Sequence, residues 1–176
     1  MCGSRSDRAL VRGGGVAYPV AMRAGDGIAI GPGDPRAAGA AALLGRSHDL
    51  MCALFPPEDN FYLDTDALRG PDVRFYVATR DGKTLGIAAL ALREGYGEVK
   101  AMFVDEAARG LGVGAALLLR IEAEARAQAL PCLRLETGNT LPAAIRLYEG
   151  HGFVRRGPFG DYPDAGSSIF MEKPLG

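Results

Sequence analysis

A glycine-rich turn constrains the fold of this chain more than any other feature of its sequence. The segment Arg109-Gly110-Leu111-Gly112-Val113-Gly114 follows an apolar run that ends at Val104 and precedes a helical pattern that begins at Ala115. Backbone N–H groups converge in such a turn, and the start of the helix adds partial positive charge. Glycine lets a ligand approach closely and tolerates positive φ. The sequence therefore predicts a site for a phosphate group at this turn.

Length and composition indicate one folded domain. The chain has 176 residues, of which 48% are hydrophobic and 23% charged, a mixture typical of globular proteins. A net charge of -1 gives no general attraction to nucleic acid or to an anionic membrane. We expect a single domain over residues 25–176, preceded by a Gly-, Ser- and Arg-rich extension over residues 1–24 that we predict to be disordered.

The cysteines and the apolar runs argue for a reduced, cytoplasmic protein. Cys2, Cys52 and Cys132 are too few and too scattered for a disulfide framework or a zinc site. Cys132 lies in an apolar strand pattern, so we expect a small core residue there. No apolar run is long enough to span a membrane, and the N-terminal segment lacks the apolar region of a signal peptide. We expect neither a metal nor a membrane or nucleic-acid partner.

The first third of the chain predicts one long helix with short elements on either side. Apolar residues recur at helical spacing over residues 35–54, with Asp34 as the expected cap and Pro35 in the first turn. A short strand is expected over residues 27–30 and a short helical piece over residues 64–68.

An antiparallel meander is expected next. Apolar runs over residues 73–79 and 84–92 flank an Asp81-Gly82 pair, which is a strong signal for a tight hairpin. A third strand is expected over residues 97–104.

The second half alternates strands and helices. We expect a helix over residues 112–130, a strand over 132–135, a helix over 142–150 and closing strands over 153–155 and 168–173. This order predicts an α/β fold with a mixed sheet and helices on both of its faces.

Two phosphate-binding folds compete for the glycine turn. The pattern Gly110-x-Gly112-x-x-Ala115, with Glu136 about 20 residues further on, formally fits a dinucleotide fingerprint. Residues 105–109 separate the strand from the first glycine, however, and too little chain follows to complete a doubly wound sheet. A nucleotide P-loop is excluded because no Gly-Lys-Ser/Thr follows the turn.

The second possibility is an arginine before two glycines, Arg109-x-x-Gly112-x-Gly114, which resembles the pyrophosphate-binding motif of the GCN5-related N-acetyltransferases (GNAT family). The run from Ala143 to Phe153 looks like the family's second signature, a helix with a tyrosine, here Tyr148, followed by Gly-Phe. The segment Leu135-Glu136-Thr137-Gly138 is similar to a bacterial branch of the family.

The resemblance covers roughly residues 26–173 and implies the acyl-CoA N-acyltransferase fold. That fold has a mixed, largely antiparallel sheet of six to seven strands with helices on both faces. It also implies a central V-shaped splay, here between Ala101–Val104 and Leu133–Leu135.

The resemblance further implies acetyl-CoA as the acyl donor and assigns residues to bind it. Backbone amides of the turn are expected to hold the pyrophosphate, and Arg109 and Gly110 to shape its opening. These amides belong to Leu111, Gly112, Val113, Gly114 and Ala115. Backbone groups of the splayed strand are expected to bind the pantetheine arm; they belong to Met102, Phe103 and Val104. Many members have a polar cofactor contact at the position of Leu141; here either Asn139 replaces this contact or the contact is lost.

The implied reaction is direct attack by a primary amine on the thioester in a ternary complex. Tyr148 is expected to contact the cofactor and to protonate the leaving thiolate, and Glu98 to take the proton from the amine, either directly or through water. The acidic and aromatic side chains His48, Glu58 and Tyr162 are the candidates to bind the acceptor. The acidic and aromatic set Glu58, Asp59, Phe61, Asp161 and Tyr162 favours a small cationic amine, and an amino acid, a polyamine, an antibiotic or a protein N-terminus stays open as the acceptor.

Two further possibilities stay open at this point. The chain could bind acyl-CoA as a sensor without catalysing transfer, because binding and turnover share most residues. A homodimer is compatible with the sequence, which does not decide it.

Overall fold

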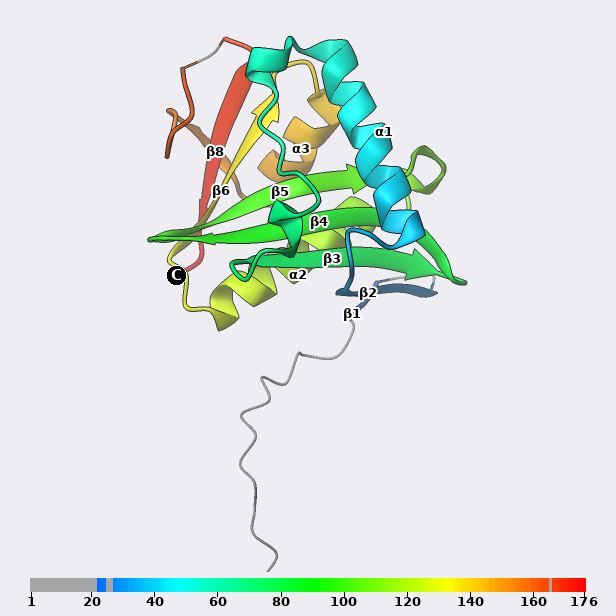
Figure 1. The fold of residues 1–176 in the computed structure, drawn as a ribbon. Coiled ribbons are helices and arrows are strands. Elements are labelled where there is room, and N and C mark those ends of the chain that lie inside the picture. The colour runs from blue at the N-terminus through cyan, green and yellow to red at the C-terminus, as the bar shows by residue number, and fades with distance from the viewer. Residues whose placement is uncertain (1–21, 25–26, 165) are drawn as a thin grey trace, which may run out of the picture.

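One eight-stranded sheet organises the part of the chain that the structure, a computed structural model, describes (Figure 1). The described residues are 22–24, 27–164 and 166–176. The strands run in the order β1-β2-β3-β4-β5-β6-β8-β7 across the sheet. Their bounds are Met22–Ala24 (β1), Ile28–Pro32 (β2), Val73–Arg80 (β3), Lys83–Arg93 (β4), Tyr96–Val104 (β5), Cys132–Gly138 (β6), Val154–Arg156 (β7) and Ser168–Pro174 (β8).

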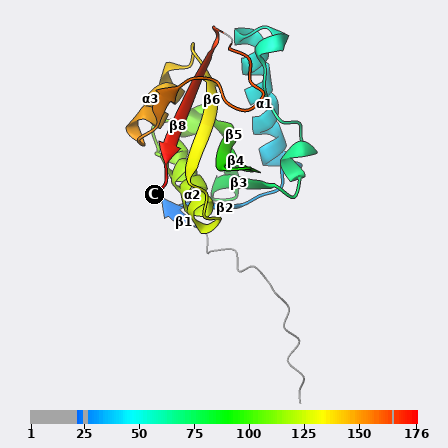
Figure 2. The same ribbon diagram turned by 90° about the vertical axis from the view of Figure 1, so that its left-hand side faces the viewer.

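Helices cover both faces of this sheet, as expected (Figures 1 and 2). Helix α1 (Ala38–Leu54) lies on one face, and α2 (Val113–Ala127) and α3 (Pro142–Gly150) lie on the other. Three short 3-10 turns, η2 (Pro57–Asp59), η3 (Ala67–Arg69) and η4 (Glu106–Ala108), lie in the connections. None of the described helices has the length and apolar composition needed to cross a membrane.

The burial of the central strand β4 shows why helices cover both faces of the sheet. Side chains alternate along a strand, so Ile87 and Ala89 pack in the cluster beneath α1, whereas Ala88 and Leu90 pack in the cluster beneath α2. All four are fully buried. A strand buried on both faces reads as a continuous apolar run, as β4 does.

The hairpin between β3 and β4 is confirmed. Asp81 and Gly82 have φ of 50° and 75°, and Arg80 pairs with Lys83 across the turn. Two successive positive φ values match the right-handed twist of the strands.

The V-shaped splay is also confirmed. Parallel pairing between β5 and β6 is confined to Gly97↔Leu133 and Glu98↔Arg134, after which the strands diverge (Figure 1). A bulge in β5 lies at this point, because its pairing with β4 shifts register and Ala101 takes a φ of 50°. The sheet therefore opens over residues 99–104 of β5.

The fold class is confirmed, and the dinucleotide alternative is wrong, because every neighbouring strand pair except β5–β6 is antiparallel. The described sheet has one strand more than expected. This strand, β1, lies inside the segment predicted as an extension, so the fold begins before residue 25. The rest of that segment, residues 1–21, lies outside the described residues.

Three local predictions need correction. Helix α1 begins at Ala38 rather than at residue 35, because Asp34 instead accepts the Arg36 N–H at 2.9 Å in a separate turn. Helix α2 ends at Ala127 and not at residue 130. Cys132 is partly exposed because it is the first residue of β6, so it is not a core residue.

Candidate active site

A cleft of about 1240 Å³ opens where β5 and β6 diverge. Its walls come from α1, the connection between α1 and β3, the glycine turn, the start of α2, and α3. The splay thus brings the two sequence signatures, the glycine turn and the Tyr148 helix, into one cavity.

The glycine turn has the backbone geometry that its sequence predicts. Gly110 and Gly112 have φ of 81° and 76°, the left-handed region that favours glycine. Gly114 has a different role, since a Cβ there would lie 3.1 Å from Leu147 Cδ2 of α3. Its missing side chain therefore allows α2 and α3 to pack closely.

Free amides gather at the start of α2. Gly112 caps the helix without a side-chain hydrogen bond, and the first turn carries no acidic residue. The first main-chain bond of this turn runs from the Ala116 N–H to the Gly112 carbonyl at 3.0 Å. Within the described residues, no hydrogen bond uses the preceding amides of Val113, Gly114 and Ala115. These three donors are available to an anion.

Two other predicted cofactor residues are engaged elsewhere. The Leu111 N–H donates to the Ala108 carbonyl at 3.3 Å, and Leu111 is not among the cleft residues. Asn139 also lies outside the lining, and its side-chain amide donates to the Gly166 carbonyl at 2.8 Å. Leu141 does line the cleft, as do the exposed Arg109 and the splayed residues Met102, Phe103 and Val104.

The side chain of Tyr148 lines the cleft. Its ring is buried against Phe153, with the ring centroids 5.8 Å apart, and it forms part of the lining. Its hydroxyl makes no hydrogen bond to any described residue. Burial and the negative charge of Glu136 raise the pKa of Tyr148 well above its usual value, so the phenol stays protonated at neutral pH.

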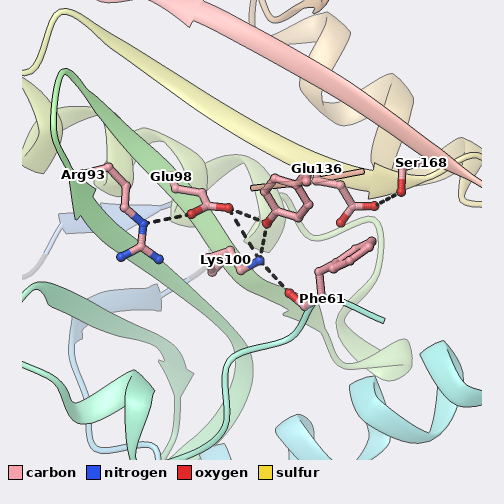
Figure 3. A network of polar contacts seen from close by, with 7 residues as sticks. Phe61, Arg93, Glu98, Lys100, Glu136 and Ser168 are labelled. Atoms are coloured by element: carbon pink, nitrogen blue, oxygen red, sulfur yellow. Dashed lines mark hydrogen bonds and ion pairs between the residues drawn. The ribbon is translucent and has the colours of Figure 1, made fainter. Parts of the chain in front are cut away.

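Glu98 lies deeper than expected and is held by several partners (Figure 3). One carboxylate oxygen accepts the Tyr162 hydroxyl at 2.5 Å and lies 3.6 Å from Lys100 Nζ. The other accepts from Arg93 Nε at 3.2 Å. Glu98 is 4% exposed and is not a lining residue, so its contact with the cleft runs through its neighbours.

Lys100 is the cation that connects this network to the cleft. It lines the cavity and donates to the Phe61 carbonyl and the Tyr162 hydroxyl, both at 2.6 Å (Figure 3). Burial lowers the pKa of Lys100, while the nearby charges of Glu98 and Glu136 oppose this change.

Glu136 is a candidate that the sequence analysis did not propose as a site residue of an acetyltransferase. It lines the cleft from β6 and accepts one hydrogen bond, from Ser168 Oγ at 2.7 Å (Figure 3). Burial raises its pKa, against the opposing effects of Ser168 and Lys100. A glutamate beside the predicted splay, alternating with the buried Leu135, was the signal that could have found it.

The predicted acceptor residues separate into two groups. His48 lines the cleft and packs edge-on against Tyr62, with ring centroids 4.5 Å apart. Glu58 is exposed on η2 outside the lining, and its neighbour Asp59 faces the cleft instead, accepting from Ser167 Oγ at 2.6 Å.

The remaining candidates follow the same division. Phe61 lines the cavity, whereas Tyr162 lies behind it and contacts two lining residues, Lys100 through its hydroxyl and Phe61 through its ring. Asp161 is exposed and outside the lining.

A splayed mixed sheet with free amides at a helix start and a tyrosine in the same cleft defines an acyltransferase fold. Residues 45–153 match the acetyltransferase (GNAT) family, and the chain belongs to that family. It is 52% identical over 124 residues to the IAA acetyltransferase of Azospirillum brasilense, covering 69% of this chain and 81% of the relative. It is 35% identical to the N-acetyltransferase YsnE of Bacillus subtilis, covering 71% of this chain and 85% of that relative.

Solved structures support the same fold. A Klebsiella pneumoniae protein assigned as an acyl-CoA N-acyltransferase superposes with a TM-score of 0.71 at 33% identity, over 84% of this chain and 97% of that one. The PaiA N-acetyltransferase of Thermoplasma acidophilum, solved in complex with coenzyme A, superposes with a TM-score of 0.66 at 16% identity, over 84% and 98% of the two chains.

Proposed function

We propose that this acetyltransferase moves the acetyl group of acetyl-CoA to a primary amine of a small molecule, by direct attack in a ternary complex. The observation that carries the proposal is one continuous cleft. It joins the free amides at the start of α2 to the Tyr148 hydroxyl and the Glu136 carboxylate. A phosphate-binding end and an acid–base end in the same cavity fit a CoA thioester and its acceptor.

The pyrophosphate of the donor is assigned to the glycine turn. The amides of Val113, Gly114 and Ala115 have no acceptor within the described chain, and the positive end of the α2 dipole favours an anion there. The exposed Arg109 adds a guanidinium at the opening of the turn. Leu111 contributes less than the sequence implied, since its N–H is bonded to Ala108.

The pantetheine arm is assigned to the open side of β5. Residues 99–104 have lost the pairing with β6 that residues 97 and 98 still make. Backbone groups of Met102, Phe103 and Val104 are therefore positioned to pair with an extended arm, much as another strand would. An N–H of this segment would also stabilise the negative charge that develops on the thioester oxygen during attack.

Tyr148 and Glu136 are the proposed acid and base. An attacking amine must lose a proton, and the leaving thiolate must gain one. Glu136 faces the cleft with a single hydrogen bond, and its charge is felt by Tyr148, so the two groups share one region. Glu98, the base expected from the sequence, lies behind Lys100 and Tyr162, so a direct contact with an acceptor fits Glu136 better.

The acceptor is assigned to the side of the cleft under α1. Aromatic and aliphatic side chains line this side, and the carboxylates of Asp59 and Glu136 face the same cavity; the lining residues here include Leu44, His48, Met51, Phe61 and Tyr62. An apolar wall with nearby carboxylates suits an amine that carries an apolar body.

Calorimetric titration with acetyl-CoA, followed by a CoA-release assay with a panel of amines and with IAA, tests the proposal. We expect saturable acetyl-CoA binding, and CoA release that depends on an amine. Binding without release under any acceptor would favour the acyl-CoA sensor. Absence of binding would overturn the assignment of the cleft. Release that depends on IAA and on no amine would overturn the acceptor class.

A further inference from the structure

The side chain of Lys100 places an amine inside the cleft, and the proposed transfer to an external acceptor gives this amine no role. The chain contains three lysines, Lys83, Lys100 and Lys173. Lys83 is exposed at the β3–β4 hairpin, and Lys173 pairs with Glu122 at 2.5 Å on β8. Of these three, Lys100 alone lines the cleft.

The position of Lys100 on β5 places its amine close to the expected reaction centre. Lys100 directly precedes the bulge residue Ala101. Met102, the first residue assigned to the donor arm, lies two positions after Lys100. Lys100 Nζ lies between the Phe61 carbonyl and the Tyr162 hydroxyl, and Glu136 lines the same cleft (Figure 3).

The surroundings of Lys100 resemble those of an activated nucleophile. The Glu98 carboxylate lies 3.6 Å from Nζ and is fixed from its other side by Arg93 at 3.2 Å. A base within reach of a nucleophile, itself held by a third group, is the usual arrangement for activation. Burial lowers the pKa of Lys100, which increases the fraction of neutral amine at a given pH.

We propose that Lys100 is an internal acetyl acceptor, modified by the donor bound in the same cleft when no amine acceptor is present. This inference rests on the proposed function, because it needs acetyl-CoA in the cleft. Glu98 takes one proton from the Lys100 ammonium. Nζ then forms a bond to the carbonyl carbon, the carbon–sulfur bond breaks, and a second proton is lost from nitrogen to the solvent. The thiolate is protonated by Tyr148, and the products are Nε-acetyl-Lys100 and CoA.

Acetylation would change the cleft in two ways. The amide has no charge, so the pairing with Glu98 would be lost. The added acetyl group would also occupy space beside Phe61, whose carbonyl now accepts from Nζ. We therefore expect the modified protein to acetylate external amines more slowly.

Site-resolved peptide mass spectrometry of the full chain tests the proposal. The protein is incubated with acetyl-CoA and no amine, and acetylation of each lysine is followed over time. We expect Lys100 to be acetylated about tenfold or more faster than Lys83 and Lys173. The reason is that binding raises the effective concentration of acetyl-CoA beside the Lys100 amine. Unfolding the protein in urea should remove this difference, since all three amines are then equally exposed.

Variants separate enzymatic from chemical acetylation. Lys100→Arg should abolish the fast acetylation of the protein, whereas Lys83→Arg, the matched exposed control, should leave this fast acetylation unchanged. Glu98→Gln, which still accepts a hydrogen bond from Tyr162, should slow modification at Lys100 without affecting Lys83.

Two results would overturn the proposal. One is equal modification of the three lysines in the folded protein. The other is an unmodified Lys100 in a protein that binds acetyl-CoA and releases CoA with amines, an outcome that leaves the proposed function standing. A protein that does not bind acetyl-CoA would overturn both.

Discussion

The Tyr162 hydroxyl donates a hydrogen bond to Glu98 Oε1 at 2.5 Å, between residues 64 positions apart in the chain. The same hydroxyl accepts from Lys100 Nζ at 2.6 Å. These contacts connect the loop before β8 to strand β5 beside the splay. Burial and the Glu98 carboxylate raise the pKa of Tyr162, so the phenol stays a donor at neutral pH.

Tyr162→Phe should destabilise the fold. The substitution leaves the buried Glu98 without one donor and Lys100 without one acceptor, and an unpaired buried group of this kind costs about 1–3 kcal/mol. Urea unfolding at pH 7.5 measures the effect. Tyr62→Phe is the control, because Tyr62 is 58% exposed and its loss should change the free energy of unfolding by less than about 0.5 kcal/mol. Equal effects of the two variants would show that the Tyr162 contacts contribute nothing.

Tyr148→Phe should separate binding from chemistry. The hydroxyl is assigned to protonate the thiolate, and loss of a general acid lowers a rate by roughly 10²–10⁴-fold. The ring still packs on Phe153, so acetyl-CoA affinity should stay within about twofold. Single-turnover kinetics and calorimetry give the two quantities. Tyr96→Phe, outside the cleft lining, should behave as the unsubstituted protein in both. An unchanged rate for Tyr148→Phe would remove Tyr148 from the mechanism.

Local patterns predicted the sheet and the glycine turn well because each depends on a few adjacent residues. The Asp81-Gly82 hairpin and the left-handed Gly110 and Gly112 follow from backbone sterics alone. The cap at Asp34 was wrong because its side chain closes a local turn on Arg36, and Asp34 lies four residues before Ala38, the first residue of the helix.

The side chains of the cleft were harder to predict, because long-range packing decides which of them face it. Glu98 and Glu136 are both glutamates on strands, and only the splay between β5 and β6 makes the second one a lining residue. The choice between Glu58 and Asp59 depends on the orientation of a single 3-10 turn, which the sequence does not specify.

Glu136→Gln should lower activity most at neutral pH. The amide retains an acceptor for Ser168 but removes no proton, so kcat/KM should fall by roughly 10²–10⁴-fold. Raising the pH supplies neutral amine from solution, and the deficit should shrink as the acceptor deprotonates towards its pKa of about 10.4 for a lysine-like amine. A pH profile of both proteins checks this. A deficit that stays constant up to pH 10 would argue against a role in proton removal.

The same substitution should stabilise the fold. Burial raises the pKa of Glu136 in the folded protein above its unfolded value, so the carboxylate at neutral pH costs stability that the protonated form does not. Glu136→Gln should therefore unfold at a higher temperature than the unsubstituted protein at pH 7.5. The difference should disappear as the pH falls below the ordinary carboxyl range. A variant that is less stable at pH 7.5 would show that the carboxylate is paired in the fold.

Gly112→Ala should weaken donor binding through the backbone. A Cβ at this position meets no atom within 4 Å, but the φ of 76° costs an alanine about 1–2 kcal/mol. Relief of that strain would reorient the amides at the start of α2, so acetyl-CoA affinity should fall by about tenfold or more. Gly150→Ala, in α3 with ordinary φ and open space, is the control and should leave affinity unchanged. Equal affinities of all three proteins would move the phosphate site elsewhere.

A buried tyrosine on the opposite face should make stability fall at alkaline pH. Tyr76 is 2% exposed and donates to Glu124 Oε2 at 2.9 Å, beneath the Arg120 guanidinium. Burial, together with the Glu124 hydrogen bond, raises its pKa to about 12.

The direction of the pH effect follows from that raised value. In the unfolded chain the Tyr76 phenol loses its proton near pH 10, whereas the folded protein keeps it until about pH 12. The stabilising contribution of Tyr76 is therefore complete below pH 10 and declines by about 2–3 kcal/mol as the pH rises towards 12. Tyr76→Phe should be less stable by about 1–3 kcal/mol at pH 8, and its deficit should narrow above pH 10. Urea unfolding of both proteins from pH 8 to 11.5 measures the difference, and a deficit independent of pH would show that the phenol ionises equally in both states.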